Sequence, residues 1–111
     1  MTMKQFIIIA YDHKDEGAYE RRLAVRAAHM KGVDVLRANG NIACGIAITD
    51  DKEKMIGSVM AMNFPTRERF DAWLKTEPYV TGRVWDKITV LNGKLAPAFE
   101  DLVSKREVQA V

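Results

Sequence analysis

The sequence predicts a single α+β domain with four strands and two main helices in the order βαββαβ. The chain has 111 residues, which is the length of one domain. Short runs rich in β-branched and aromatic residues alternate with two helical segments. Hydrophobic residues make up 48% of the chain and charged residues 29%, a composition that is globular and excludes disorder.

The first half of the chain is expected to hold a strand, a long helix and a second strand. Residues 3–11 are predicted to form a strand with apolar side chains on both faces. After a polar turn, residues 18–39 are predicted to form a helix that Gly40 ends at its C′ position. Residues 41–48 are predicted to form the second strand, and residues 50–54 a charged hairpin turn.

The second half is expected to repeat the alternation with a shorter helix. Residues 55–63 are predicted to form the third strand, and Thr66 is a good N-cap for the second helix. That helix should present three apolar side chains on one face, namely Phe70, Trp73 and Leu74. The segment 77–79 should break or restart it, because the residue before a proline avoids helix. Residues 84–92 are predicted to form the fourth strand.

The chain is expected to divide into a domain at residues 1–95 and a short helix and tail at 96–111. Residues 97–105 are predicted to form the short amphipathic helix, with three apolar residues on one side, Phe99, Leu102 and Val103. The βαββαβ order is that of the ferredoxin-like fold, which places two helices on one face of an antiparallel sheet. The other face would stay bare in a monomer. Because residues 6–11 are apolar on both faces, as is the run Ile88, Val90 and Leu91, we expect a homodimer that packs sheet to sheet.

Charge and composition exclude several classes of partner and cofactor. Seventeen basic and fifteen acidic residues leave a formal net charge of +2, so we expect no nucleic acid partner. The apolar run at 6–10 is too short to span a membrane. Cys44 is the single cysteine, expected to be a small buried residue in a reducing, cytoplasmic setting. With His13 and His29 it has no zinc-like spacing, and no glycine-rich loop is present, so we expect no metal and no cofactor.

Three basic residues share the apolar face of the long helix. At about 100° per residue, Arg22, Arg26 and His29 fall within the stripe that should face the sheet. Burying such groups is costly unless each finds a partner. One interpretation is structural: the arginines pair with Glu77, Asp86 or a partner subunit, or they extend their charged ends to water at the edge of the helix. The other is a pocket that holds an anionic ligand.

The chain resembles the YciI-like (YCII-related) family of small bacterial proteins, from about residue 5 to about residue 93. The resemblance is carried by the helix block 20–30, Gly57-Ser58, Trp73, Glu77-Pro78-Tyr79-Val80 and Gly82-Arg83-Val84-Trp85. It implies a dimeric α+β barrel, the fold group that also holds muconolactone isomerase-like enzymes. One characterised branch of the family eliminates chloride from a chlorinated hydroxyquinone.

The resemblance also implies a site. The family's proposed catalytic histidine and aspartate map to His29 and Glu77, so this chain keeps the carboxylate with one more methylene. Four further residues are expected to bind substrate, namely Arg22, Arg26, Ser58 and Tyr79. Where the family usually has Gly-Pro at the end of the second strand, this chain has Gly45-Ile46.

Two functional hypotheses follow. The first is a cofactor-free small-molecule enzyme, a lyase, isomerase, hydrolase or dehydrochlorinase-like protein in which His29 and Glu77 transfer protons on an anionic or phenolic substrate. The second is a non-catalytic module that uses the same pocket to hold a metabolite, or its dimer surface to hold another protein. Turnover governed by a group that titrates near neutrality would favour the first hypothesis.

Overall fold

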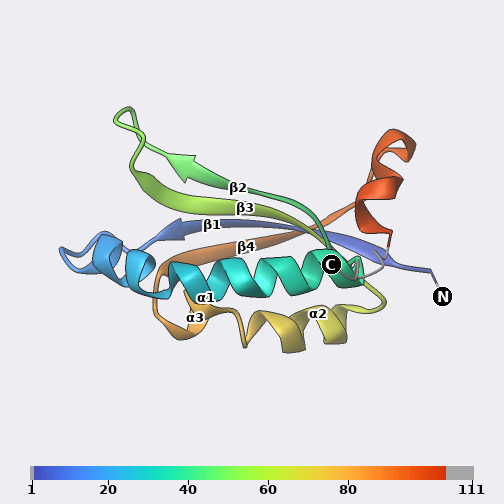
Figure 1. Ribbon diagram of the computed structural model, residues 1–111, viewed down its shortest axis with the longest axis horizontal. Coiled ribbons are helices and arrows are strands. Elements are labelled where there is room, and N and C mark those ends of the chain that lie inside the picture. The colour runs from blue at the N-terminus through green and yellow to red at the C-terminus, as the bar shows by residue number, and fades with distance from the viewer. Residues whose placement is uncertain (1, 105–111) are drawn as a thin grey trace, which may run out of the picture.

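The computed structural model describes residues 2–104 as a four-stranded antiparallel sheet with three helices against one face (Figure 1). The predicted βαββαβ order is confirmed, with one additional helical turn before the last strand. The elements are β1 Lys4–Asp12, α1 Ala18–Asn39, β2 Ile42–Thr49, β3 Met55–Phe64, α2 Arg67–Leu74, α3 Pro78–Thr81, β4 Trp85–Gly93 and the 3₁₀ helix η1 Pro97–Val103.

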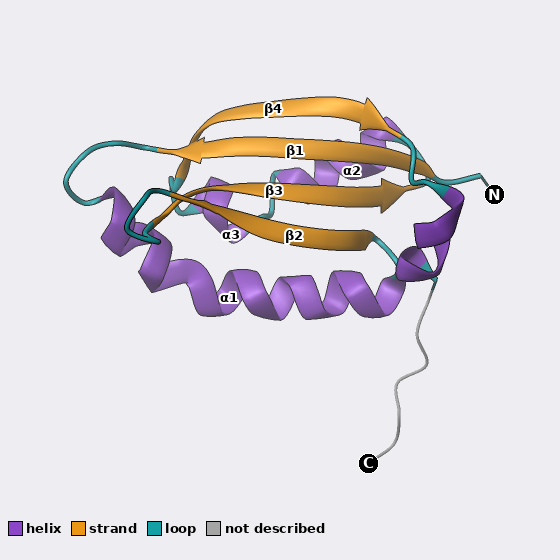
Figure 2. Ribbon diagram, turned by 90° about the horizontal axis from the view of Figure 1, so that it is seen from above, coloured by secondary structure: helices purple, strands orange, loops and turns teal. Residues whose placement is uncertain are grey.

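The strand order is β2-β3-β1-β4, so the first strand lies inside the sheet, as Figure 2 shows from above. Ile8 lies opposite Met60 of β3 on one side and Val90 of β4 on the other. This register places alternate residues of all three strands on the same face.

The helix-facing side of the sheet carries the core. Phe6, Ile8 and Ala10 of β1 are at most 2% exposed. Aromatic rings cover the same face, because Phe70 of α2 stacks on Phe6 with ring centroids 4.7 Å apart and meets Phe64 edge-on. The predicted apolar face of α2 therefore closes one end of this core and leaves the other end to α1 and α3.

Capping residues mark the ends of the helices at the positions that the sequence predicts. Gly40 adopts φ 77°, and its N–H bonds back to α1, which makes it the expected left-handed stop. The Thr66 side chain accepts a hydrogen bond from the N–H of Arg69 and caps α2. The backbone at Glu77 is extended, which interrupts the helical conformation before Pro78. The Glu77 side chain then caps α3 by accepting a hydrogen bond from the N–H of Tyr79.

The buried stripe of α1 is narrower than the sequence predicts. Its buried residues are Ala18, Arg22, His29 and Leu36. Leu23 and Met30 are 48% and 40% exposed, although the helical spacing assigns them to the same stripe. The difference arises because α1 covers only part of the sheet, so a side chain at the margin of the stripe projects past it.

The other face of the sheet is more exposed. Tyr11, Ile46 and Leu91, which belong to three different strands, are 48%, 65% and 46% exposed. The second face of β1 is thus bare in the single chain, as the sequence predicts for a monomer, and its burial by a second copy stays a prediction. We call this surface the open face.

Cys44 and the C-terminal helix both differ from expectation. Cys44 is exposed rather than buried, because its register opposite Ala61 places it on the open face. The terminal helix is a 3₁₀ helix that ends at Val103 and leaves Phe99 exposed, and Lys105 lies outside the described residues. Figure 1 shows η1, in orange-red, on the side of the sheet opposite α1. Within residues 2–104 no helix is long and apolar enough to cross a bilayer.

Candidate active site

A cavity of about 190 Å³ lies between α1 and the strands β2 and β3. It is lined by Arg22, Arg26, His29, Met30, Val33, Gly45, Ile46, Ala47, Met55, Ser58, Met60 and Tyr79. Five of the six residues that the sequence assigns to the site line it, and the sixth, Glu77, lies directly behind His29. The cavity is smaller than the roughly 300–1,000 Å³ typical of drug-sized ligands, so it suits a small molecule.

His29 and Glu77 form a buried hydrogen-bonded pair. His29 Nδ1 lies 2.5 Å from Glu77 Oε1, and the two residues are 8% and 3% exposed. The same carboxylate oxygen accepts the N–H of Tyr79. Because an ionised carboxylate only accepts hydrogen bonds, Nδ1 carries a hydrogen, and neutral imidazole keeps its lone pair on Nε2. The predicted proximity of these residues is therefore present, although 48 positions separate them in the sequence.

Tyr79 packs between the other side chains of the site. Its ring stacks on His29, with centroids 3.9 Å apart and planes 16° from parallel. The Arg22 guanidinium lies 4.6 Å from the centre of the same ring, in a cation–π contact. Burial raises the pKa of the Tyr79 hydroxyl, and the nearby charges of Arg22 and Arg26 partly oppose that rise. The phenol thus stays protonated to a higher pH than an exposed tyrosine.

Arg22 is held by a partner that the sequence analysis missed. Its Nη1 donates to both oxygens of Asp12, at 2.9 and 3.0 Å, and its Nη2 donates to Ser58 Oγ at 3.1 Å. Within the chain, the expected partners Glu77 and Asp86 are not the ones this arginine uses. Burial raises the pKa of the Asp12 carboxyl, and the charge of Arg22 opposes that shift.

The alternation of β1 residues between the two faces of the sheet indicates that Asp12 is buried on the face that packs against the helices. Asp12 has the same parity as Phe6, Ile8 and Ala10, so the two-residue period of β1 carries it to the buried face. Its charge led the sequence analysis to place it in the polar turn. The strand instead continues through Asp12 because Arg22 neutralises the carboxylate there.

Arg26 does not lie in the buried stripe. Its side chain is exposed and contributes to the mouth of the cavity. Long basic side chains commonly lay their aliphatic part on a protein surface and keep the charge in water. A positive charge at the mouth would attract an anion without the desolvation cost of full burial.

The departure from the family pattern on β2 falls on the cavity wall. Gly45 and Ile46 both line the cavity, as does Met55 at the start of β3. The nearest neighbour of a side chain built at Gly45 would be Met60, at 3.8 Å, so the glycine leaves room for a slightly larger residue. These positions therefore form part of the cavity wall.

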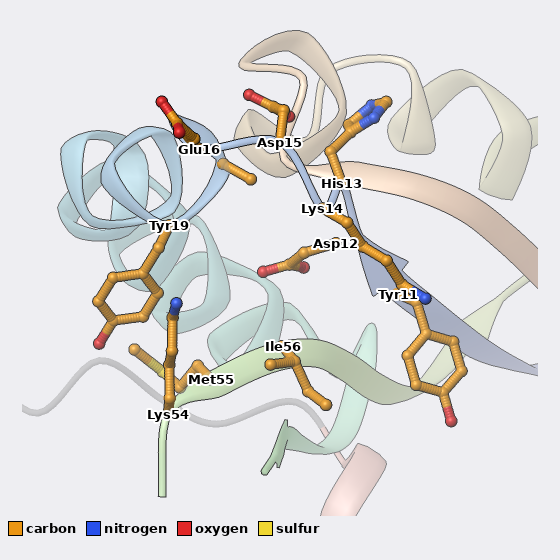
Figure 3. A pocket seen from close by; sticks show the side chains of 11 residues that line it. Tyr11, Asp12, His13, Lys14, Asp15, Glu16, Tyr19, Lys54, Met55 and Ile56 are labelled. Carbon is orange, nitrogen blue, oxygen red and sulfur yellow. The ribbon is translucent and has the colours of Figure 1, made fainter. Parts of the chain in front are cut away.

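A second and larger cavity, of about 410 Å³, lies at the loop between β1 and α1 (Figure 3). It is lined by Tyr11, Asp12, His13, Lys14, Asp15, Glu16, Ala18, Tyr19, Lys54, Met55 and Ile56. Its histidine, His13, pairs with the exposed Asp86 at 3.6 Å, and the buried carboxylate of this cavity, Asp12, is bound to Arg22 instead. Because a buried histidine–carboxylate pair adjoins only the smaller of these two cavities, we take that one as the candidate active site. Among residues 2–104 no group of three or more His, Cys, Asp or Glu side chains is arranged to hold a metal.

Comparison with known proteins agrees with this architecture. Residues 4–94 match the model of the YCII-related domain. The chain is 29% identical over 91 residues to the YciI proteins of Escherichia coli and Shigella flexneri, covering 77% of this chain and 91% of each relative.

A solved structure shares the fold. It is the 5-chloro-2-hydroxyhydroquinone dehydrochlorinase TftG from Burkholderia phenoliruptrix, in complex with 2,5-dihydroxybenzoquinone. The TM-score is 0.70 at 23% sequence identity, over 85% of this chain and 97% of that one. The family model spans nearly all of the sheet and its helices, from β1 to β4. On this evidence the chain belongs to the YCII-related domain family.

Proposed function

We propose that the protein is a cofactor-free small-molecule enzyme in which His29 and Glu77 transfer protons on an anionic or phenolic substrate. The observation that carries this proposal is the buried hydrogen bond between the two side chains at the wall of a small cavity. A carboxylate on Nδ1 fixes the tautomer and orientation of the ring, and it stabilises the imidazolium that forms when Nε2 takes a proton.

The pair can serve two related reactions. In an isomerisation, Nε2 removes a proton from one carbon of the substrate, the C–H electron pair enters the conjugated system, and the imidazolium returns the proton to another atom. In an elimination, the same electron pair forms a C=C bond while a leaving group such as chloride departs with its bonding pair, and His29 keeps the proton until water removes it. Neither reaction needs an oxidant or a reductant.

The substrate class follows from the charges around the cavity. Arg22 and Arg26 line it, and the carboxylates that approach it, Asp12 and Glu77, are each bound to a basic side chain. An anion or a phenolate is therefore the ligand best matched to the charges there. The solved structure with the same fold is named for the dehydrochlorination of a hydroxylated aromatic compound, which supports this substrate class.

The test is substitution of His29 with an isosteric side chain that cannot act as a base. His29→Gln should lower turnover by about 10²–10⁴-fold on any compound that the parent converts, among small phenols, chlorinated hydroxyquinones and lactones. Conversion is followed by NMR in deuterated water, which also detects proton exchange without net reaction. His13→Gln, which changes the half-buried histidine outside this cavity, is the matched control and should behave as the parent.

The outcome also separates enzyme from binding module. Turnover in the parent that is lost in His29→Gln supports the enzyme. Tight binding of a compound from the panel with neither turnover nor proton exchange would contradict it and would identify a non-catalytic binding protein. An early-melting His29→Gln variant with unchanged ligand behaviour would show that the histidine is structural.

A further inference from the structure

The larger cavity, beside the loop between β1 and α1, lies outside the proposed acid–base site. Neither His29 nor Glu77 lines it. Its volume of about 410 Å³ falls within the range of roughly 300–1,000 Å³ that is typical of small-molecule sites. The cavity therefore has room for a ligand of its own.

Aromatic and apolar side chains form one wall of this larger cavity. Figure 3 shows Tyr19 of α1 together with Met55 and Ile56 of β3 around the same space. All three residues are half-buried. A tyrosine ring, a thioether and a branched aliphatic chain together form a surface on which a flat aromatic ring packs favourably.

Lys54 places a positive charge beside this wall. Its Nζ lies 4.8 Å from the centre of the Tyr19 ring, in a cation–π contact. Within residues 2–104 Lys54 forms no ion pair with a carboxylate. Its ammonium is therefore held near an aromatic ring and remains available to an anion in the cavity.

The acidic residues that line the larger cavity do not cancel this charge. Asp12 and Asp15 each accept two hydrogen bonds from an arginine. Figure 3 shows the Glu16 side chain pointing away from the Lys54 ammonium. Lys14 adds a second positive charge to the lining. A ligand in this cavity therefore meets an excess of positive charge next to an aromatic and apolar wall.

We propose that the larger cavity binds a small aromatic carboxylate, with its ring on the wall of Tyr19, Met55 and Ile56 and its carboxylate at Lys54 Nζ. The wall favours a flat ring, and the ammonium favours a negative charge at the edge of that ring. The site does not include the pair of His29 and Glu77, so the inference does not rest on the proposed function.

The methionines of the chain allow the position of a bound ligand to be tested. Met55 lines both cavities, whereas Met30 and Met60 line only the smaller one. The full chain, labelled with ¹³C at the methionine methyl groups, is titrated with 2-naphthoate and followed by NMR. Met55→Leu assigns the Met55 signal. The probe should shift the Met55 methyl signal and leave those of Met30 and Met60 in place.

A second measurement tests the role of the charge. Lys54→Met removes the ammonium but keeps a long aliphatic side chain, and it should weaken 2-naphthoate binding about 3- to 10-fold. Lys52→Met makes the same change in net charge at an exposed lysine of the same hairpin that does not line the cavity, so it should match the parent. The uncharged 2-naphthamide should bind the parent more weakly than 2-naphthoate does, and its affinity should not depend on Lys54.

The outcomes are distinct from those that test the acid–base pair. Saturable binding that shifts Met55 and depends on Lys54 supports the inference, whether or not His29→Gln loses turnover. Shifts at Met30 or Met60 that equal the shift at Met55 would place the probe in the smaller cavity and overturn it. Equal losses of affinity in Lys54→Met and Lys52→Met, or a parent that shows no saturable binding, would also overturn it.

Discussion

Each buried charged side chain among residues 2–104 is paired, and the pairing explains why such costly groups are tolerated. Arg22 and Asp12 are 2% and 8% exposed and bind each other through two hydrogen bonds. Removing one member of a buried pair leaves the other without compensation, which is far more destabilising than losing an ion pair at the surface. The stability of the site is therefore concentrated in a few contacts.

Asp12→Ala should lower the free energy of unfolding by about 3–5 kcal/mol, because it leaves the Arg22 charge buried and unpaired. Urea denaturation followed by far-ultraviolet circular dichroism measures the change. The matched control is Asp71→Ala, which breaks the exposed pair with Arg67 and should cost less than about 0.5 kcal/mol. Equal effects of the two substitutions would show that Asp12 is not needed to balance Arg22.

The raised pKa of Tyr79 gives a prediction about high pH. The folded chain holds the phenolic proton above the pH at which the unfolded chain releases it, near 10. The contribution of this pKa shift to the free energy of unfolding should therefore be fully present below pH 10. It should be lost as pH rises toward the pKa of Tyr79 in the folded chain. Spectrophotometric titration should show one of the three tyrosines ionising later than the others. Tyr79→Phe should remove that late step, whereas Tyr11→Phe should leave it.

The helical period of α1 locates two of the site's side chains, and the same period misplaces a third. Arg22 and His29 are seven residues apart, almost two full turns, so both face the sheet. Arg26 lies between them in sequence but at the margin of the stripe, where a long side chain reaches water. Periodicity assigns a side to each residue, but it does not show where the neighbouring element ends.

The accuracy with which an element's boundary is predicted depends on whether nearby or distant residues determine that boundary. Gly40, Thr66 and Pro78 act through their own backbone or nearest turn, and each marks a boundary correctly. The strand limits shift by about one residue, because hydrogen bonds to distant strands decide where a ladder ends. The 3₁₀ form of η1 likewise depends on packing that a short sequence window does not contain.

The docking of α3 on α1 depends on a glycine. A side chain on Gly82 would meet the Pro78 carbonyl oxygen at 2.8 Å and Val25 of α1 at 3.1 Å. Gly82→Ala should therefore push α3 away from α1, carry Glu77 away from His29, and lower both stability and turnover. The expected loss of stability is about 1–3 kcal/mol, the usual cost of overpacking.

Gly32→Ala provides the comparison for this substitution. Gly32 lies within α1, and apart from the adjoining backbone of the helix no atom lies within 4 Å of the position where a side chain would begin. Alanine should stabilise the helix there by about 0.5–1 kcal/mol. Melting temperatures that move in opposite directions for Gly82→Ala and Gly32→Ala would support this account, and a shift in the same direction would refute it.

At the scale of the whole molecule, the open face predicts self-association. Its apolar side chains include Ile7, Ile9, Tyr11, Ile46, Val59 and Leu91. A small sheet protein gains stability by burying such a surface, and a second copy of the chain offers the complementary one. We therefore predict a homodimer with a mass about twice 12.5 kDa.

Ile46→Asp should weaken this dimer, because it places a charge in the middle of the contact. Analytical ultracentrifugation over a range of concentrations measures the shift toward the monomer. Val35→Asp, which changes a comparably exposed residue on the outer side of α1, is the control and should leave the mass unchanged. A parent that sediments as a monomer at micromolar concentration would contradict the prediction.

The central position of β1 determines when the chain can fold during synthesis. β1 hydrogen-bonds to β3 and β4, so it stays without one neighbour until residue 93 has emerged from the ribosome. Contacts that join distant parts of a chain slow folding and keep apolar strands exposed for longer. Arg22 can find Asp12 early, since ten residues separate them, whereas His29 must wait for Glu77. A nascent or truncated chain that ends before Glu77 therefore contains the contact between Arg22 and Asp12 but not the pair of His29 and Glu77, so that buried pair forms late in translation.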